Sequence, residues 1–590
     1  MASVSAFVLS DSDSSDSDTS GSESPVGSLS QQPSVSSSFS GCGPLAPPER
    51  APLCSSFEAT EDSVAQEEGG VVLKMRDGDT LTFAGDVSVQ VVQGGSVRCL
   101  GAVLPSGSAP VSMHCSSRDP RALLQLRASA LEEPTTSPKA ARVHVRVRAC
   151  GKRGTSREES HTFRGVCGFH PLLGLEAQDP TFRPLQIDDS WMTALEKVES
   201  AVEKKSADAR KTAKSRFHSV AVVGPRNSGK STLARFLCNG LLNRHKAVLW
   251  VETDAGQPQF GAEGVLALTL VQKPLFGGRS TTTPLHAVYV GTNTPADAPM
   301  RFRSCLRELS AALHEFAAER QRVLRRNDSA DGYTLPVIVN THGWVQGFGK
   351  QVLGDVLRLF SVGHVVELTD MSDKTRIFQS NELPAECMHM SVPRQTQIYS
   401  KDSRVDRRHN SLLAYLTNLS TASLNSAAAA RVLRHAPVRL LPFAATSLCF
   451  AFGAPERGHA LHAITACVVA LAARVSGNDD SECAHSYEEH GLRVCDGTPR
   501  HRCLGLALVR AIDVTKGILG LVTPLSAQEL ATCDLVIRGL TPTPARMLWL
   551  GATVGGRHVT DTPFLSHAAA ALSTAQHFRG RAQLKRGRPE

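Results

Sequence analysis

Residues 224–231 constrain the fold of this chain more than any other segment. They read GPRNSGKS and fit the pattern G-x-x-x-x-G-K-[ST] at every position. The apolar run Val220–Val223 precedes them and a helix-like pattern follows, so the loop is expected to join a strand to a helix. In that setting the glycines let backbone N–H groups turn toward an anion at the helix N-terminus. We therefore predict a phosphate-binding loop in an α/β domain.

The side chains of this loop indicate a nucleotide with a divalent cation. Lys230 can reach the β- and γ-phosphates, and the hydroxyl of Ser231 can ligate Mg²⁺. ATP and Mg²⁺ are the expected cofactors. The predicted nucleotide-binding residues are Gly224, Pro225, Arg226, Asn227, Ser228, Gly229, Lys230, Ser231 and Thr232.

A second apolar strand pattern, Ala247–Val251, ends in two acids, Glu252 and Asp254. Residues two apart on a strand point to the same side, so both carboxylates can face the phosphate loop. One can hold Mg²⁺ through water while the other takes a proton from an attacking hydroxyl. We assign Asp254 to the metal. Which of the two acids is the base stays open, and so does the possibility that Asp254 only opens a turn.

Length and composition predict several folded units in a reducing compartment. At 590 residues the chain exceeds one compact core, and 41% hydrophobic residues suit a globular protein. Its 15 cysteines form no C-x-x-C pair, which favours neither a disulfide framework nor a zinc ribbon. The N-terminus lacks the pattern of a secretory signal, and the apolar run Ala463–Ala473 is too short to span a bilayer. We expect a soluble intracellular protein without a membrane partner.

Changes in pattern along the chain predict its organisation. Strand patterns alternating with helical ones, such as Arg301–Leu324 with Phe302, Leu306, Leu309, Leu313 and Phe316 on one face, indicate a parallel sheet covered on both sides. The predicted class is α/β: a P-loop NTPase domain with a parallel sheet, between an N-terminal β-sandwich-like domain and a C-terminal, mostly β domain. The expected segments are a disordered acidic serine-rich tail (1–56), the N-terminal β domain (57–185), the P-loop kinase domain with a lid (186–435), the C-terminal domain (436–578) and a basic tail (579–590).

Two common classes of P-loop protein are disfavoured. A GTPase would carry D-x-x-G and N-K-x-D patterns, and an ABC-type ATPase would carry L-S-G-G-Q. Neither set is present.

Four motifs in order give a specific resemblance. The segments GPRNSGKSTLARFL, ETDAGQPQF, TTTPLHAVYVGTNTP and VIVNTHGWVQGFG resemble those of the nucleolar polynucleotide 5′-hydroxyl kinases, P-loop enzymes of ribosomal RNA processing. The resemblance covers about Val71–Ser420 and is weak in the C-terminal third. It implies an ATP-dependent kinase acting on the 5′-hydroxyl end of RNA, a nuclear and nucleolar location, and partnership with the endonuclease that cuts the precursor of ribosomal RNA.

The resemblance also assigns roles to further residues. It assigns ATP binding to the phosphate loop with Lys230 and Ser231. It assigns metal binding and activation of the hydroxyl to the strand end with Glu252, Asp254 and Gln257, where Glu252 replaces the Asp of other members and Gln257 is a candidate substrate contact.

The segment Ser400–Leu416 resembles the arginine-bearing lid of that family. Arg404 and Arg408, four apart on one helical face, would neutralise the transferring phosphoryl group, or else belong to a basic surface helix. Trp344 either stacks on a terminal base or belongs to a core.

Two other functions stand beside the favoured kinase. The chain could be a nucleotide-bound, non-catalytic scaffold for the endonuclease, or a kinase of nucleosides or other small molecules. The intact Lys230, Ser231 and acidic strand end favour an enzyme. The size of the chain and its flanking domains disfavour a small-molecule kinase.

Overall fold

The computed structural model describes a large part of the chain, and every described residue belongs to one compact unit, Leu53–Glu590. The predicted basic tail and nearly all of the predicted acidic tail lie outside the described residues. The described ranges are 55–115, 123–131, 142–150, 169–173, 185, 187–212, 216–277, 282–326, 334–370, 376–394, 404–418, 432–433, 435–475, 485–543, 553–554 and 557–558.

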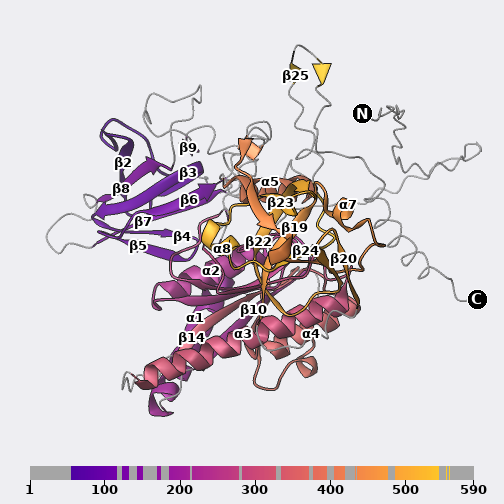
Figure 1. The fold of residues 1–590 in the computed structure, drawn as a ribbon. Coiled ribbons are helices and arrows are strands. Elements are labelled where there is room, and N and C mark those ends of the chain that lie inside the picture. The colour runs from indigo at the N-terminus through magenta and orange to yellow at the C-terminus, as the bar shows by residue number, and fades with distance from the viewer. Residues whose placement is uncertain are drawn as a thin grey trace, which may run out of the picture. The chain divides into compact units, whose positions relative to one another are not determined.

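The first sheet has nine strands, all in antiparallel pairs (Figure 1). Its order is β1-β2-β8-β3-β7-β4-β5, and β6 and β9 also pair with β3. Buried and partly exposed residues alternate along β8, as expected for a strand with one face on a core. The strands are β1 (Val64–Glu67), β2 (Gly70–Arg76), β3 (Thr80–Gln93), β4 (Gly95–Cys99), β5 (Ala102–Pro105), β6 (Val111–Cys115), β7 (Leu124–Ala130), β8 (Arg142–Ala149) and β9 (Phe169–Pro171).

The second sheet has seven strands in the order β13-β12-β11-β14-β10-β15-β16 and is mixed. Its parallel members are β10 (Arg216–Val223), β11 (Val248–Glu252), β14 (Thr334–Asn340), β15 (Val362–Thr369) and β16 (Met388–Pro393).

At one edge of the sheet, β12 (Val265–Val271) pairs antiparallel with both β11 and β13 (His286–Tyr289). The predicted parallel sheet therefore holds for the five strands named above and is corrected at this edge, where β12 reverses direction. The chain between β11 and β12, residues 253–264, holds no helix, and a parallel return requires a crossover connection.

Helices cover both faces of this sheet. Val220 and Val222 of β10 pack in a core with α1 (Asp189–Thr212) and α2 (Lys230–Leu242), whereas Ala221 and Val223 pack with α3 (Pro299–Arg326) and α4 (Phe348–Leu359). This split follows from the alternation of side chains along a strand. The predicted apolar face of α3 is confirmed, with four of its five residues buried and Phe316 packed at the margin: Phe302, Leu306, Leu309, Leu313 and Phe316.

The third sheet has eight strands in the order β17-β23-β22-β19-β24-β18-β21-β20. Short helices α7 (Ala460–Ile464) and α8 (Ala527–Leu530) accompany it, and β25 (Thr553–Val554) pairs with β26 (Arg557–His558). Its strands are β17 (Arg439–Pro442), β18 (Ser447–Phe450), β19 (Val468–Arg474), β20 (His485–Glu489), β21 (Leu492–Asp496), β22 (His501–Asp513), β23 (Ile518–Val522) and β24 (Leu535–Arg538).

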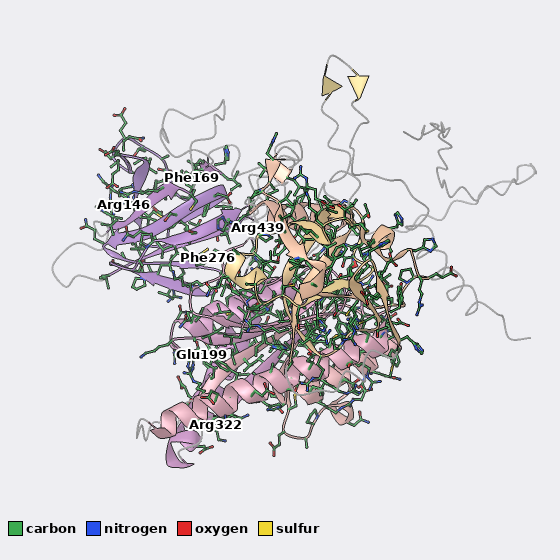
Figure 2. All side chains as sticks on the ribbon, in the orientation of Figure 1. Arg146, Phe169, Glu199, Phe276, Arg322 and Arg439 are labelled. Carbon is green, nitrogen blue, oxygen red and sulfur yellow. The ribbon has the colours of Figure 1, made fainter. Side chains whose placement is uncertain are left out.

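Specific hydrogen bonds join the first sheet to the central domain. The amide nitrogen of Asn239 on α2 donates to the carbonyl oxygens of Leu100 and Leu275 at 2.9 and 3.1 Å. The backbone nitrogen of His114 donates to the carbonyl oxygen of Phe276 at 3.1 Å (Figure 2). The helix that begins at the phosphate loop is thus tied to the N-terminal sheet.

The third sheet contacts the edge strand β13. The backbone nitrogen of Tyr289 donates to Nε2 of His501 at 3.2 Å, and the nitrogen of Leu540 donates to the carbonyl oxygen of Gly291 at 2.6 Å. A Cβ on Gly539 would lie 2.6 Å from the Cα of Gly291, so the two backbones meet at a distance that only glycine allows. Among the described residues, no helix combines the length and apolar character needed to cross a bilayer.

Candidate nucleotide-binding and phosphoryl-transfer site

The phosphate loop lies between the end of β10 and the start of α2. Asn227 and Gly229 have φ angles of 63° and 98°, a left-handed conformation that turns the chain into the helix. Gly229 caps α2, and no side chain accepts a hydrogen bond at this cap. A Cβ on Gly224 would lie 2.6 Å from Oγ of Ser228 and 3.1 Å from Cβ of Leu368, so a side chain there would require Ser228 to move. The helix N-terminus and its dipole therefore face the loop, as an anion site requires.

Lys230 is buried at the centre of this loop. Its side chain is 6% exposed, and Nζ donates to the carbonyl oxygen of Pro225 at 2.8 Å. Burial lowers the pKa of Lys230 to about 8, and the negative charge of Asp254 acts in the opposite direction. A phosphate oxygen is the kind of acceptor that would replace the Pro225 carbonyl and hold the ammonium charge.

Glu252, the last residue of β11, is fully buried and accepts four hydrogen bonds. Oε1 accepts from the backbone nitrogen of Asp254 at 3.0 Å and from Nδ2 of Asn340 at 2.9 Å. Oε2 accepts from Nε1 of Trp250 at 3.1 Å and from the backbone nitrogen of Gln259 at 2.9 Å. Burial and the charge of Asp254 raise the pKa of Glu252, whereas the donors from Gln259, Asp254 and Trp250 lower it. Its oxygens hold the turn after β11 in place.

Asp254 is only partly buried, and its environment differs from that of Glu252. Its Oδ1 accepts from the backbone nitrogen of Gly256 at 3.0 Å, and its charge acts on Lys230. Gln257, which directly follows Gly256 in this turn, is exposed. Of the two predicted acids, Asp254 has the carboxylate that solvent and a ligand can reach.

Asn340, at the end of β14, links the acidic turn to the phosphate loop. Besides Glu252, its Nδ2 approaches Oγ of Ser231 at 3.4 Å, and its buried Oδ1 has no partner among the described residues. The described residues form no cluster of three or more His, Cys, Asp or Glu that could hold a metal ion. Oxygens of Ser231, Asp254 and Asn340 are the hard ligands that Mg²⁺ prefers. The residues therefore fit a magnesium nucleotide.

The residues after Asn340 pack against the phosphate loop. The hydroxyl of Thr341 donates to the carbonyl oxygen of Val222 at 2.7 Å, and a Cβ on Gly343 would lie 2.9 Å from both Cα and N of Arg226. Trp344 is partly buried, and its ring centroid lies 6.2 Å from that of Phe348. The side chain of Trp344 is thus neither fully exposed nor fully enclosed.

A loop after β13, residues 291–297, approaches the phosphate loop. Nη2 of Arg226 donates to Oγ1 of Thr294 at 3.4 Å, and Nδ2 of Asn293 donates to Oε1 of Glu263. Glu263 is 8% exposed. This loop, the acidic turn and the phosphate loop surround one region.

The predicted lid helix is present as α5 (Arg404–Thr417). Nη1 of Arg408 lies 3.8 Å from Oε1 of Glu263, so this arginine pairs with the acid that also holds Asn293. The side chain of Arg404 lies outside the described residues. Arg408 therefore reaches the neighbourhood of the site through Glu263.

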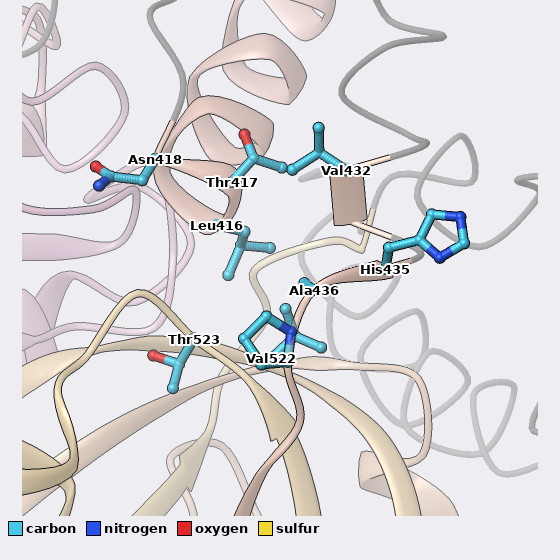
Figure 3. A pocket seen from close by; sticks show the side chains of 9 residues that line it. Leu416, Thr417, Asn418, Val432, His435, Ala436, Val522 and Thr523 are labelled. Carbon is cyan, nitrogen blue, oxygen red and sulfur yellow. The ribbon is translucent and has the colours of Figure 1, made fainter.

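A cavity of about 430 Å³ lies between the C-terminal end of α5 and the end of β23 (Figure 3). None of the predicted site residues lines it, so it is separate from the candidate site. Its lining is Leu416, Thr417, Asn418, Val432, His435, Ala436, Pro437, Val522 and Thr523.

Sequence reasoning missed Asn340, His342 and Glu263 as members of the site. Asn340 and His342 stand where the apolar strand VIV gives way to polar residues, and that change was the available signal. Glu263 carries no motif, and only the fold brings it to Asn293 and Arg408.

The loop, the acidic turn and the sheet define a P-loop nucleotide-binding protein. The family model described as mRNA cleavage and polyadenylation factor CLP1 P-loop matches residues 224–418, and the model described as NOL9-like, C-terminal domain, matches residues 454–544. The chain thus carries a CLP1-type P-loop domain followed by a NOL9-like C-terminal domain.

Several curated relatives share the name polynucleotide 5′-hydroxyl-kinase NOL9. The polynucleotide 5′-hydroxyl-kinase NOL9 of Danio rerio is 28% identical over 379 residues, which cover 59% of this chain and 48% of that protein. The protein of that name from Arabidopsis thaliana is 26% identical over 346 residues, covering 55% and 86%, and the one from Homo sapiens is 26% identical over 372 residues, covering 55% and 49%. The chain spans about half the length of the zebrafish and human relatives. The predicted resemblance to polynucleotide 5′-hydroxyl kinases is confirmed.

A solved structure of the wild-type Clp1p–Pcf11p complex aligns with a TM-score of 0.48 and 13% identity, covering 80% of this chain and 97% of that one.

Proposed function

We propose that this chain is an ATP-dependent polynucleotide kinase that transfers the γ-phosphoryl group of ATP to the 5′-hydroxyl end of RNA. The observation that carries the proposal is the buried Lys230 in a phosphate loop, with its charge coupled to Asp254, which lies two residues beyond the end of β11. The names of the relatives, polynucleotide 5′-hydroxyl-kinases, support the choice of acceptor.

The phosphate loop and α2 bind the phosphates of the nucleotide. The N-terminus of α2 supplies backbone donors and its dipole, and Lys230 leaves the carbonyl oxygen of Pro225 for a phosphate oxygen. Ser231, Asp254 and Asn340 hold the metal or its water. Mg²⁺, when bound, neutralises charge on the β- and γ-phosphates.

Asp254 is the residue we assign to the attacking hydroxyl as well as to the metal. The 5′-oxygen forms its bond to the γ-phosphorus as the bond to the β-phosphate oxygen breaks, ADP leaves, and the hydroxyl proton passes to a carboxylate oxygen of Asp254. Glu252 is a weaker candidate base because all four of its hydrogen bonds are to protein donors. Glu252 then positions Asp254 through the backbone nitrogen of that residue.

Other predicted residues complete the proposal. Arg408, with Arg404, neutralises charge on the transferring group after Arg408 leaves Glu263. Gln257 and Trp344 contact the end of the RNA, the tryptophan by stacking on a base. The non-catalytic scaffold is less well supported, because a scaffold that only binds a nucleotide needs Lys230 and its loop but no carboxylate for the attacking hydroxyl, the role proposed for Asp254.

Location and partners follow from the family resemblance alone. We propose a nuclear and nucleolar protein that acts on the ribosomal RNA precursor together with the endonuclease that cuts its internal spacer. An RNA processing step that leaves a 5′-hydroxyl end must precede the action of such a kinase.

The test is transfer of labelled phosphate from γ-labelled ATP to three acceptors: an RNA with a 5′-hydroxyl end, a DNA of the same sequence, and a nucleoside. We expect transfer to the RNA and none to the nucleoside. Transfer to the nucleoside alone would indicate a small-molecule kinase, and transfer to none of them would support the scaffold.

A further inference from the structure

His342 stands two residues beyond Asn340, the last residue of β14. Strand β14 lies between β10, which leads into the phosphate loop, and β11, which ends in the acidic turn. The carboxyl ends of these parallel strands meet at one edge of the sheet, so His342 stands between the residues that hold phosphate and the residues assigned to the hydroxyl. The residue after it, Gly343, packs on the backbone of Arg226.

The hydrogen bonds of His342 fix which ring nitrogen carries the proton. The backbone nitrogen of Trp344 donates to Nδ1 at 3.3 Å, so Nδ1 is an acceptor and carries no hydrogen. A neutral imidazole must then carry its proton on Nε2.

The Nε2–H group is a buried donor without an acceptor. His342 is 1% exposed, and Nε2 has no hydrogen-bond partner among the described residues. Nearly all buried donors in folded proteins are paired, so an unpaired one beside a phosphate loop has the chemistry of a site for an oxyanion. The ring itself is held edge-on to Phe302, at 5.7 Å between centroids, and cannot turn without disturbing that packing.

We propose that Nε2–H of His342 donates a hydrogen bond to an oxygen of the γ-phosphoryl group of ATP. The inference rests on the proposed function, since it requires that the loop binds ATP. A neutral donor orients the phosphoryl group without adding charge to a region that already holds Lys230 and Arg226. His342 thereby distinguishes ATP from ADP, because ADP lacks the group that the donor meets.

Two substitutions separate this role from a structural one. In His342→Gln the amide nitrogen takes the place of Nε2 and keeps the outer donor, but the acceptor for Trp344 is lost. In His342→Asn the amide oxygen takes the place of Nδ1 and keeps that acceptor, but the outer donor is lost. Thermal unfolding of both variants first establishes that each is folded.

The measurement is calorimetric binding of a non-hydrolysable ATP analogue and of ADP to the full chain. His342→Asn should bind the ATP analogue more weakly by on the order of 10-fold, the usual effect of losing a hydrogen bond to a charged group, with ADP binding unchanged. His342→Gln should keep most of the preference for the ATP analogue.

Four results would overturn the inference. Unchanged affinity of His342→Asn for the ATP analogue would show that Nε2 meets no phosphate. Equal loss of both nucleotides, or loss in His342→Gln with His342→Asn normal, would assign the histidine to holding Trp344. A wild-type chain that binds neither nucleotide would overturn the proposed function and the inference with it, whereas the first three outcomes leave ATP binding by the wild type intact.

Discussion

At the scale of single residues, the carboxylates of Glu252 and Asp254 differ in what surrounds them. The oxygens of Glu252 accept four hydrogen bonds in a fully buried position, whereas Asp254 accepts one from Gly256 and stays partly exposed. The two carboxylates of this motif therefore differ in role: Glu252 holds the turn, and Asp254 is the one that we propose contacts the ligand.

Glu252→Gln should destabilise the fold as well as change activity. Its amide NH₂ would face two of the donors that now bind the carboxylate, and an unpaired buried donor costs about 1–3 kcal/mol. Chemical denaturation of the variant against the wild type measures this loss. A variant as stable as the wild type, with only the pH–rate profile altered, would return Glu252 to the role of base.

Asp254→Asn should leave stability unchanged within about 0.5 kcal/mol, because the residue is partly exposed and the neutral amide keeps its shape. The variant should instead need more Mg²⁺ for half-maximal activity, since a carboxylate ligand is lost. A titration of activity against Mg²⁺ tests this. An unchanged midpoint would remove Asp254 from the metal.

The site residues that the sequence predicted and those that it missed differ in how far along the chain their partners lie. The role of Lys230 follows from neighbours within a few residues, because the loop and α2 are local structure. The roles of Asn340 and His342 depend on β14 lying between β10 and β11, an order that the chain reaches only after folding. The pairing of Glu263 with Arg408 is equally non-local.

At the scale of elements, α5 is the helix that we propose as the lid, and Arg408 is its described link to the candidate site. Arg408→Ala should lower kcat by at least about 10-fold and raise the KM for ATP less, because charge develops on the phosphoryl group in the transition state. Arg404→Ala should act in the same direction. Arg322→Ala, at an exposed position on α3, is the control. A small change in KM with kcat unchanged would make α5 an ordinary basic helix.

Strands β10 and β15 are joined by a buried pair of histidines. Nε2 of His218 lies 2.8 Å from Nδ1 of His364, and burial lowers the pKa of His218 to about 3. In the unfolded chain a histidine titrates near pH 6.5, so below this pH the unfolded state binds a proton that the folded state refuses. Stability is therefore full above about pH 6.5 and falls as the pH drops toward 3.

The free energy of unfolding should fall by about 1 kcal/mol from His218 alone between pH 7.5 and pH 5.5. His218→Gln should reduce this slope, whereas His485→Gln, at an exposed position on β20, should keep it. Denaturation curves at the two pH values give the comparison. Equal slopes in the wild type and in His218→Gln would contradict the assignment.

At the scale of the whole molecule, the C-terminal sheet supports the edge of the central domain. Arg301 on α3 donates to the carbonyl oxygens of Val290 and Tyr289 and to the hydroxyl of Thr498, and so joins both parts. The sequence predicted a mostly β segment here, but no local pattern could give its contact with Gly291, which starts the loop that reaches Thr294 and Arg226.

Gly539→Ala should destabilise the protein by about 1–3 kcal/mol, because the new methyl group would lie 2.6 Å from the Cα and carbonyl oxygen of Gly291. Gly354→Ala is the matched control: its methyl group would meet only Arg358, at 3.8 Å, on helix α4, where alanine is favoured. Denaturation midpoints compare the two. Equal stability of both variants would show that the two backbones do not meet at Gly539.

We propose that Lys230 and its loop serve the transfer of phosphate to a 5′-hydroxyl end. The direct test is the rate at which the Lys230→Ala variant moves labelled phosphate from γ-labelled ATP to an RNA with a 5′-hydroxyl end. The control is Lys246→Ala, an exposed lysine before β11, at the opposite edge of the sheet from the loop. At saturating ATP, the transfer rate of Lys230→Ala should be lower than that of the wild type by on the order of 100-fold or more, although the variant stays folded. Lys246→Ala should keep wild-type turnover. Wild-type turnover in Lys230→Ala, or no transfer by the wild type to any 5′-hydroxyl end, would contradict the proposal.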